Sequence, residues 1–215
     1  MFRTRTCDGI ALAILTLLLI IYGVYCANRF AIFYWYHKPN LEDQFIQGIP
    51  LSGWGTFYFL TFNTISALAI VSHQRASAVD PGRIPEGMKA PFKSEYNQML
   101  VCEKCKGQET WKPARAHHCR ECGFCVFKMD HHCPWINNCV GHRNLKYFVQ
   151  FCSYTGVAAI YLSLLMCISF YQLLSCAKPK LHMNKPWYPY VFVMCILAFV
   201  EGLLFAFFTY ELIQE

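Results

Sequence analysis

Apolar residues gather in four long stretches of the chain, and polar residues fill the segments between them. The stretches are Ile10–Ala27, which continues into Phe30–Trp35, Trp54–Val71, Tyr147–Leu174 and Tyr188–Tyr210. Each is close to or longer than the ~20 residues that a helix needs to cross a bilayer. The pattern predicts an α-helical polytopic membrane protein with four transmembrane helices.

The first apolar stretch has two interpretations. It follows Arg3 and Arg5, as the apolar part of a secretory signal peptide would. No small-x-small cleavage site follows it, and its length suits a full span. We therefore favour an uncleaved transmembrane helix.

Composition and charge support a membrane protein and suggest its orientation. The chain is 55% hydrophobic and only 15% charged, against about 25% in soluble domains. Residues 73–146 hold 12 of the 19 Lys and Arg residues, which predicts that this segment faces the cytosol. Four spans then place both termini on the cytosolic side. Three lysines between the last two stretches, Lys178, Lys180 and Lys185, argue mildly against this topology.

A dense group of cysteines and histidines lies in the central polar segment. Seven of the 13 cysteines and five of the 8 histidines fall between Cys102 and His142. Short Cys-x2-Cys spacings let a tight turn direct two thiolates at one ion, so the pattern predicts tetrahedral zinc sites. A disulfide framework belongs to short secreted chains and does not fit here. On the metal pattern alone, a zinc-stabilised interaction module without catalysis is the favoured interpretation.

The group contains one cysteine more than two zinc sites require. Two Cys3His sites use six cysteines, and the group contains seven. Asp130, His131 and Cys133 lie within four residues and offer an orienting carboxylate, a base and a nucleophile. Cysteine reacts as the thiolate, which a neighbouring histidine favours. The surplus cysteine therefore favours an enzyme.

The motifs of this segment resemble those of the DHHC cysteine-rich domain of protein S-acyltransferases (palmitoyltransferases). They are Cys102-x2-Cys105, Lys112-Pro113-x-Arg115-x-His117-His118-Cys119, Asp130-His131-His132-Cys133-Pro134-Trp135 and Asn137-Asn138-Cys139-Val140-Gly141. Asp80-Pro81-Gly82, after the second apolar stretch, resembles the family's DPG motif. Lys106–Trp111 makes a longer gap than the family usually shows, and we expect it to form a loop.

The resemblance implies a role for each of these residues. One structural zinc ion would be held by Cys102, Cys105, His118 and Cys125. A second would be held by Cys119, Cys122, His132 and Cys139. Cys133 would accept the acyl group, with His131 as general base and Asp130 orienting it. The implied layout is residues 1–72 with the first two spans, residues 73–146 as a cytosolic segment with the zinc cluster at about 101–146, and residues 147–215 with the last two spans.

The family's co-substrate is a long-chain acyl-CoA such as palmitoyl-CoA, and the resemblance suggests where it binds. Trp135, Phe148 and Phe151 lie at positions that line the family's acyl cavity, although the two phenylalanines also fit ordinary core or lipid-facing positions. Four basic residues are candidates for contacts with CoA phosphates, and each also fits attraction to anionic lipid headgroups: Arg115, Lys128, Arg143 and Lys146.

Several polar and small residues lie inside the predicted spans. We interpret Asn63 and Glu201 as helix–helix hydrogen-bonding groups rather than catalytic ones, and they are candidates to pair with each other. Gly156 fits either the far end of an acyl cavity or close packing of two helices.

The expected partners are acyl-CoA, membrane lipids and proteins that present juxtamembrane or lipidated cysteines at the cytosolic face, with no nucleic acid. The run Glu201–Phe205 looks most like Golgi members of the family, with the endoplasmic reticulum and plasma membrane as alternatives. The family usually has a Thr-Thr-x-Glu-like motif and a tail after the last span, and here only Thr209 and Glu211 are near. The competing hypothesis is therefore a non-catalytic membrane adaptor or shortened regulatory form.

Overall fold

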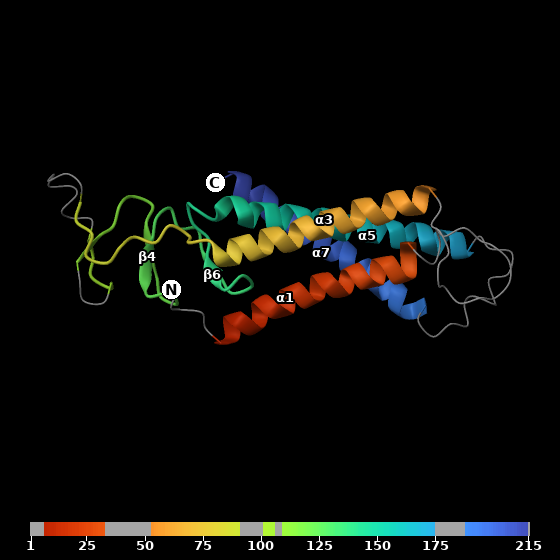
Figure 1. The fold of residues 1–215 in the computed structure, drawn as a ribbon, viewed down its shortest axis with the longest axis horizontal. Helices are drawn as coiled ribbons and strands as arrows, with labels where there is room; N and C mark the ends of the chain where they lie inside the picture. The colour runs from red at the N-terminus through yellow and green to blue at the C-terminus, as the bar shows by residue number, and fades with distance from the viewer. Residues whose placement is uncertain (1–6, 33–52, 91–100, 106–108, 175–187, 215) are drawn as a thin grey trace. The chain divides into compact units, whose positions relative to one another are not determined.

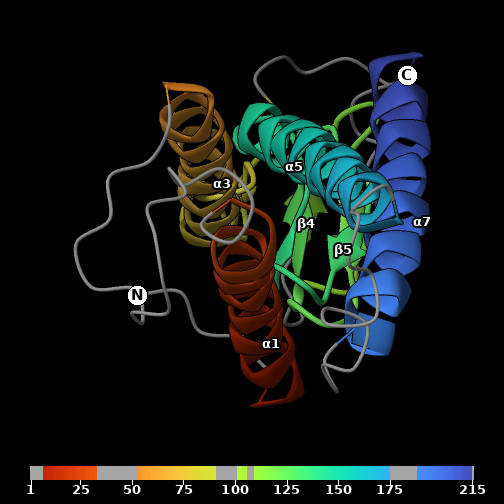
Figure 2. The ribbon, with the colours of Figure 1, turned by 90° about the vertical axis from the view of Figure 1, so that its right-hand side faces the viewer.

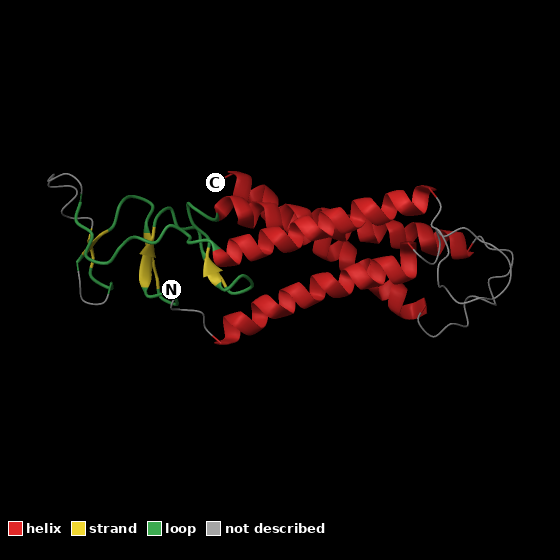
Figure 3. Cartoon of the chain, viewed as in Figure 1, coloured by secondary structure: helices red, strands yellow, loops and turns green. Residues whose placement is uncertain are grey.

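The computed structural model describes residues 7–32, 53–90, 101–105, 109–174 and 188–214. The helical elements in chain order are α1 (Cys7–Cys26), the π-helix η1 (Ala27–Ile32), α3 (Gly53–Ala78), α5 (Leu145–Leu174) and α7 (Tyr188–Gln214) (Figure 1). The strands lie between α3 and α5 and are short: β1 (Val101–Cys102), β2 (Thr110–Trp111), β3 (His117–Cys119), β4 (Phe124–Val126), β5 (His132–Cys133) and β6 (Asn138–Cys139) (Figure 3). Arg3, Arg5 and the three lysines that bear on the predicted topology lie outside the described residues.

The chain forms two compact units, each assembled from two segments. The first, which we call the cysteine-rich unit, combines Met1–Leu18 with Ile70–Phe151. The second, which we call the helical unit, combines Leu19–Ala69 with Cys152–Glu215.

Three described helices are long and apolar enough to cross a membrane. They cover Cys7–Arg29, Gly53–Ala78 and Leu145–Ile168, with 23, 26 and 24 residues. A helix satisfies its own backbone hydrogen bonds, which a span in hydrocarbon requires. The prediction of a largely helical membrane protein is therefore confirmed for three spans. The fourth predicted span coincides with helix α7.

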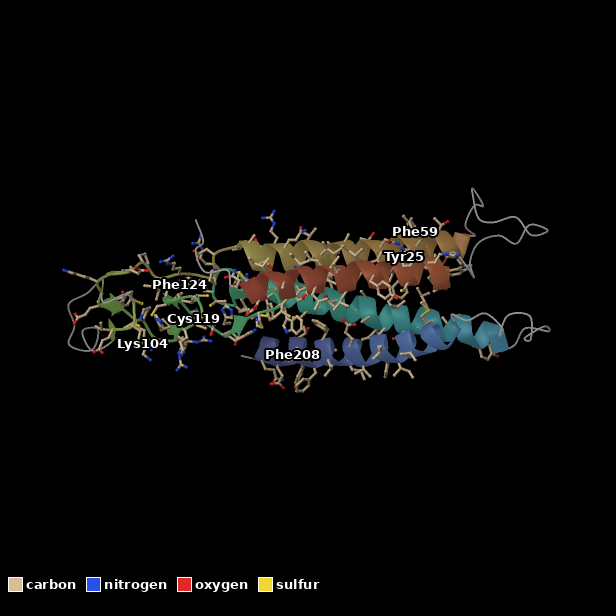
Figure 4. The ribbon with its side chains drawn as sticks, turned by 90° about the horizontal axis from the view of Figure 1, so that it is seen from below. Tyr25, Phe59, Lys104, Cys119, Phe124 and Phe208 are labelled. Atoms are coloured by element: carbon tan, nitrogen blue, oxygen red, sulfur yellow. The ribbon has the colours of Figure 1, made fainter. Side chains whose placement is uncertain are left out.

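The helical unit is apolar outside as well as inside. Large apolar side chains are exposed on its helices, among them Leu19 on α1 and Phe208 on α7, the latter labelled in Figure 4. Such exposure is unusual for a soluble protein and suits contact with lipid. The buried core comprises Ala27, Ala31, Ile32, Phe62, Leu162, Leu165, Met166 and Ala198.

Polar and small residues pack the helices of this unit together. The side-chain amides of Asn28 and Asn63 bond reciprocally at 3.0 Å. The suggested pairing of Asn63 with Glu201 is therefore wrong, because η1 places Asn28 opposite Asn63. Gly156 and Gly202 let α5 and α7 approach closely, since a Cβ at Gly202 would lie 2.7 Å from Ile160 Cγ1.

The cysteine-rich unit is built from three antiparallel strand pairs, β1–β2, β3–β4 and β5–β6, among its described residues. Each strand has only two or three residues, so the sheets bury little apolar surface. Thr110–Trp111 pairs with β1. The expected loop over Lys106–Trp111 is therefore wrong for its last two residues, while residues 106–108 lie outside the described part.

The Asp80-Pro81-Gly82 segment forms a tight turn against the strand pair β3–β4. Asp80 Oδ1 accepts hydrogen bonds from the backbone amides of Gly82 and Arg83 at 2.7 and 2.8 Å, which is an Asx turn. Gly82 has φ +105°, a conformation that favours glycine. The next residue but one, Ile84, donates its amide to the Cys125 carbonyl at 2.9 Å. The turn thus fixes the chain leaving α3 beside a predicted zinc ligand.

Two asparagines bond to carbonyls in the last turn of α3 and just after it, where the carbonyls of a helix lack partners within the helix. Asn138 Nδ2 donates to the carbonyls of Ala76, Ser77 and Val79 at 2.9–3.2 Å. Asn144 Nδ2 donates to the carbonyls of Ala76 and Cys139 at 3.1 and 2.8 Å. Figure 1 shows β6 beside this end of α3. The end of α3 is therefore bonded directly to the β5–β6 hairpin.

A substitution at Gly141 can test how closely this hairpin packs against the Asp80 turn. A methyl group there would lie 2.5 Å from the Pro81 carbonyl oxygen and 2.6 Å from Val126 Cγ1. We expect Gly141→Ala to destabilise the cysteine-rich unit by about 1–3 kcal/mol, measured as a lower thermal unfolding midpoint in detergent. Gly23→Ala on α1 is the control, because a Cβ there meets no atom within 4 Å. Equal midpoints for the two variants would contradict the packing described.

Candidate metal centres and catalytic loop

The first group of ligand atoms comes from Cys102, Cys105, His118 and Cys125, which lie within 4.8 Å of one another. His118 Nδ1 is 3.6, 3.4 and 3.9 Å from the sulfurs of Cys102, Cys105 and Cys125. The sulfurs of Cys105 and Cys125 are 3.7 Å apart. A tetrahedral zinc ion with Zn–S of ~2.3 Å and Zn–N of ~2.0–2.1 Å requires S···N of about 3.6 Å and S···S of about 3.8 Å. The donor set fits zinc in both chemistry and size.

The second group comes from Cys119, Cys122, His132 and Cys139, also within 4.8 Å of one another. His132 Nδ1 is 3.5, 3.4 and 3.6 Å from the sulfurs of Cys119, Cys122 and Cys139. Cys122 and Cys139 sulfurs are 3.4 Å apart, somewhat shorter than the ideal edge. The structure therefore brings together both predicted ligand sets, each able to hold a metal ion.

The β3–β4 hairpin contributes to both groups, and strand geometry explains how. Neighbouring residues of a strand point to opposite faces, so His118 and Cys119 face different groups. His118 pairs with Cys125 across the hairpin, and Cys119 pairs with Phe124. Cys119 and Phe124, which pair across the hairpin, are labelled in Figure 4, and strands β4 and β5 are labelled in Figure 2. One short hairpin thus interleaves the two metal groups.

The electrostatics of the groups also favour a cation. Burial, together with the neighbouring thiols of Cys102 and Cys105, raises the pKa of Cys125. Hydrogen bonding to the thiols of Cys119 and Cys122, and then burial, raises the pKa of Cys139. Thiolates packed this closely repel one another, so they cannot all ionise without a compensating charge. A divalent ion held by these residues would supply that charge, because thiolates are the form that ligates a metal.

The Asp130–Cys133 segment places the predicted catalytic groups around strand β5. Asp130 Oδ2 lies 2.6 Å from His131 Nδ1, so the carboxylate accepts the Nδ1 proton and leaves Nε2 as the basic nitrogen. Backbone bonds from Val140 to His131 and from Asp130 to Val140 continue the pairing of β5 with β6. In such an extended segment His131 and Cys133 share one face and His132 the other. The geometry separates the two adjacent histidines.

Cys133 itself is buried, with 5% of its surface exposed. Burial raises the pKa of its thiol, while hydrogen bonds from the backbone amides of Ile136 and Trp135 lower it. A buried thiol needs a base to become a nucleophile, and His131 shares its face of the strand.

The predicted aromatic residues divide into two environments. Phe148 and Phe151 are buried on α5, and their ring centroids are 6.4 Å apart. Phe148 lies edge-on to the His131 ring, with ring centroids 5.3 Å apart. Trp135 is 48% exposed and does not join this pair.

The four predicted basic residues are all exposed in the described part of the unit. Arg115 and Lys128 both have positive φ, 64° and 45°. They come close along the backbone, because Met129 donates its amide to the Arg115 carbonyl at 3.2 Å. Arg143 donates its amide to the Pro81 carbonyl at 3.3 Å, and Lys146 lies in the first turn of α5. The His142 amide donates to the Phe127 carbonyl at 3.2 Å, so the backbone segments that carry Lys128 and Arg143 are also bonded to each other.

Sequence reasoning missed the residues at the end of α3. His73 is 1% exposed, and its Nε2 lies 3.0 Å from the Trp135 carbonyl oxygen. Asn138 and Asn144 bond the last carbonyls of the helix. A histidine at the polar end of an apolar stretch was the available signal, but its partner is 62 residues away.

Comparison with known proteins gives a consistent result. A family model described as DHHC palmitoyltransferase matches residues 95–214. The chain is 37% identical over 214 residues to palmitoyltransferase ZDHHC3 of Homo sapiens, covering 97% of this chain and 66% of the relative. It is 42% identical over 154 residues to ZDHHC3-A of Danio rerio, covering 69% and 47%. With ZDHHC7 of Rattus norvegicus it is 33% identical over 209 residues, covering 94% and 61%. The chain thus spans 47–66% of the length of these curated relatives.

The two histidines of the segment are expected to respond differently to substitution. His132→Ala removes the only nitrogen from the second group, so we expect one zinc ion per chain to be lost on challenge with a chelator. His131→Ala is the matched control and should retain both ions, because its ring contacts Asp130 and Phe148 instead. Zinc per chain is measured by elemental analysis after the chelator step. Equal loss from both variants would refute this division.

Proposed function

The chain belongs to the DHHC palmitoyltransferase family, and from this premise we propose that it is a protein S-acyltransferase. It transfers a long-chain acyl group from palmitoyl-CoA or a similar acyl-CoA to cysteines of other proteins, through a thioester on Cys133. The observation that carries the proposal is the 2.6 Å contact of Asp130 with His131, on the face of the strand that also bears Cys133.

The reaction has two thioester exchanges. His131 Nε2 takes the proton of Cys133, and the thiolate attacks the carbonyl carbon of the acyl thioester. The C–S bond to CoA breaks, and the CoA sulfur takes that proton from His131 and leaves as the thiol. A substrate cysteine then gives its proton to His131 and attacks acyl-Cys133; the bond from the acyl carbon to Cys133 breaks, and the Cys133 sulfur takes the proton back as the free thiol. Because the bonds broken and formed are alike, positioning and thiolate activation supply most of the rate enhancement.

Zinc has a structural role in this proposal. Each predicted site has four protein ligands, so no position remains for a substrate. Bound zinc would stabilise the cysteine-rich unit, whose strands bury little apolar surface, and would hold strand β5 through His132.

The same premise places the acyl-CoA. Its acyl chain would pack against Phe148, Phe151 and Trp135, because burial of each CH2 group contributes about 0.8 kcal/mol to the binding free energy. The exposed charges of Arg115, Lys128, Arg143 and Lys146 would meet CoA phosphates.

We propose the layout expected from the sequence for the whole protein. Residues 1–72 and 147–215 would each contribute two spans, with α7 as the fourth, and residues 73–146 would face the cytosol with both termini. Helix α3 continues past residue 72 to Ala78, so the membrane boundary would fall within its last turns. Substrate proteins would present juxtamembrane or lipidated cysteines at the cytosolic face of a Golgi membrane.

Acyl loading tests the proposal directly. Purified protein incubated with labelled palmitoyl-CoA should gain hydroxylamine-labile label, and Cys133→Ala should gain none, because no other residue is proposed to carry the acyl group. Cys167→Ala, which removes an exposed cysteine of α5, is the control and should load normally. Absence of label on the unmodified protein would favour the non-catalytic adaptor.

The dyad of Asp130 and His131 gives a second test. We expect His131→Ala to lower the loading rate by about 10²–10⁴-fold, the usual contribution of a general base. Asp130→Asn should also slow loading while both zinc ions remain bound, because it alters the partner of Nδ1 and not a ligand. Loading at the unmodified rate in either variant would exclude the dyad from the chemistry.

A further inference from the structure

His73 is a buried polar residue that the proposed acyl transfer does not use. It lies on α3, four residues before Ser77, and only 1% of it is exposed. Its Nε2 is 3.0 Å from the Trp135 carbonyl oxygen. A carbonyl oxygen only accepts, so Nε2 carries the hydrogen and donates it. The other ring nitrogen, Nδ1, is buried without a hydrogen-bond partner among the described residues.

That half-satisfied ring needs an explanation. A buried nitrogen without a partner destabilises a fold relative to an apolar side chain of the same shape. Stability alone would therefore favour phenylalanine or leucine at this position, in a helix that is apolar along most of its length. The half-satisfied ring therefore points to a role for the His73 bond beyond stability.

The accepting carbonyl belongs to the turn that carries the nucleophile. Trp135 is two residues after Cys133, in a turn closed by the bond from the Asn137 amide to the Pro134 carbonyl at 3.1 Å. The backbone amides of Trp135 and Ile136 follow Cys133 in this turn, and hydrogen bonding from them lowers the pKa of its thiol. A shift of the Trp135 peptide would therefore move a group that acts on the reacting sulfur.

Only one other described donor approaches the same carbonyl, and it is weaker. Thr16 Oγ1 is 3.5 Å from the Trp135 oxygen but 2.9 Å from the Leu12 carbonyl of its own helix. A hydroxyl has a single hydrogen, and the shorter bond to Leu12 uses it. Among the described residues, His73 thus provides the strong restraint on this peptide.

The other side of the His73 ring leads to the proposed base. His73 lies edge-on to Phe151, with centroids 5.0 Å apart and rings at 71°. Phe151 contacts Phe148 at 6.4 Å, and Phe148 contacts His131 at 5.3 Å. Aromatic pairs prefer such edge-to-face geometry. One buried side chain is therefore connected both to the turn of the nucleophile and, through two rings, to the imidazole of the base.

We propose that His73 is a positioning residue for acyl transfer, which holds the Cys133 turn and the His131 imidazole in a fixed relation. The proposal rests on the proposed acyltransferase function. Histidine suits the task because it combines an N–H donor with an aromatic ring. Phenylalanine would keep only the ring, and glutamine would keep only the donor.

The test compares four variants with the unmodified protein: His73→Phe, His73→Gln, His73→Ala and the control Ser66→Ala. Ser66 is a buried polar residue of the same helix that donates to its own Phe62 carbonyl. We measure Cys133 loading against palmitoyl-CoA concentration, zinc per chain and hydrogen–deuterium exchange of residues 134–138. Zinc content and exchange do not depend on turnover.

We expect His73→Phe to lower the maximal loading rate by about 10- to 100-fold, as a small misplacement of reacting groups does. Its KM should stay within about twofold, since no substrate contact is removed. Exchange in residues 134–138 should become faster, with both zinc ions retained. His73→Gln should load faster than His73→Ala because it restores the donor, and Ser66→Ala should match the unmodified protein.

Three outcomes would overturn the inference. Unmodified loading and exchange in His73→Phe would show that the bond does not position the turn. Zinc loss in parallel with the rate would assign His73 to folding instead. A rise in KM alone would assign it to acyl-CoA binding. If the unmodified protein takes no label, acyl transfer itself fails, and that failure is distinguishable because it precedes any substitution.

Discussion

The alternation of side chains along strand β5 is the constraint on which the catalytic arrangement depends. His132 faces three cysteine sulfurs at 3.4–3.6 Å. Because neighbouring side chains of an extended segment point to opposite faces, a bound His132 fixes the direction of both His131 and Cys133. Metal binding and the proposed chemistry would therefore be coupled through one peptide segment, although the proposal gives no zinc ligand a part in the reaction. Two histidines in sequence are what this geometry requires.

Two groups of metal-binding side chains take the place of a large hydrophobic core in the cysteine-rich unit. Its apolar clusters are small and are made largely of the cysteines themselves, with Ile84, Ala116, Phe124 and Val126 among their few other members. Strands of two or three residues have little stability of their own. The ligands instead connect segments distant in the sequence, and the hydrogen bonds of the Asp80 turn and of Asn138 and Asn144 link them to α3. The unit is thus stabilised by a small number of specific bonds rather than by buried area.

The features that followed from the sequence are those with local signals. Apolar length predicts a span because a bilayer has a fixed thickness, and Cys-x2-Cys spacing predicts a knuckle because a tight turn brings two sulfurs together. The grouping of eight ligands into two sets came from resemblance, since composition alone allows many pairings. The partner of Asn63 and the strand at Thr110–Trp111 required contacts between distant residues. His73 was missed for the same reason: its identity is visible in the sequence, but its meaning depends on Trp135.

Burial of Cys133 explains why the groups around its thiol have to be placed accurately. A buried thiol resists ionisation, which protects it from oxidation and unproductive alkylation in the free protein. In the proposed reaction, the same burial would exclude water from the thioester on Cys133 and so disfavour hydrolysis. The thiolate would then depend on groups placed accurately around it, namely the proposed base His131 and the amides of Trp135 and Ile136. The proposed chemistry would therefore require a support for that turn, and the end of α3 is bonded to it through His73 and to the adjoining strand β6 through Asn138.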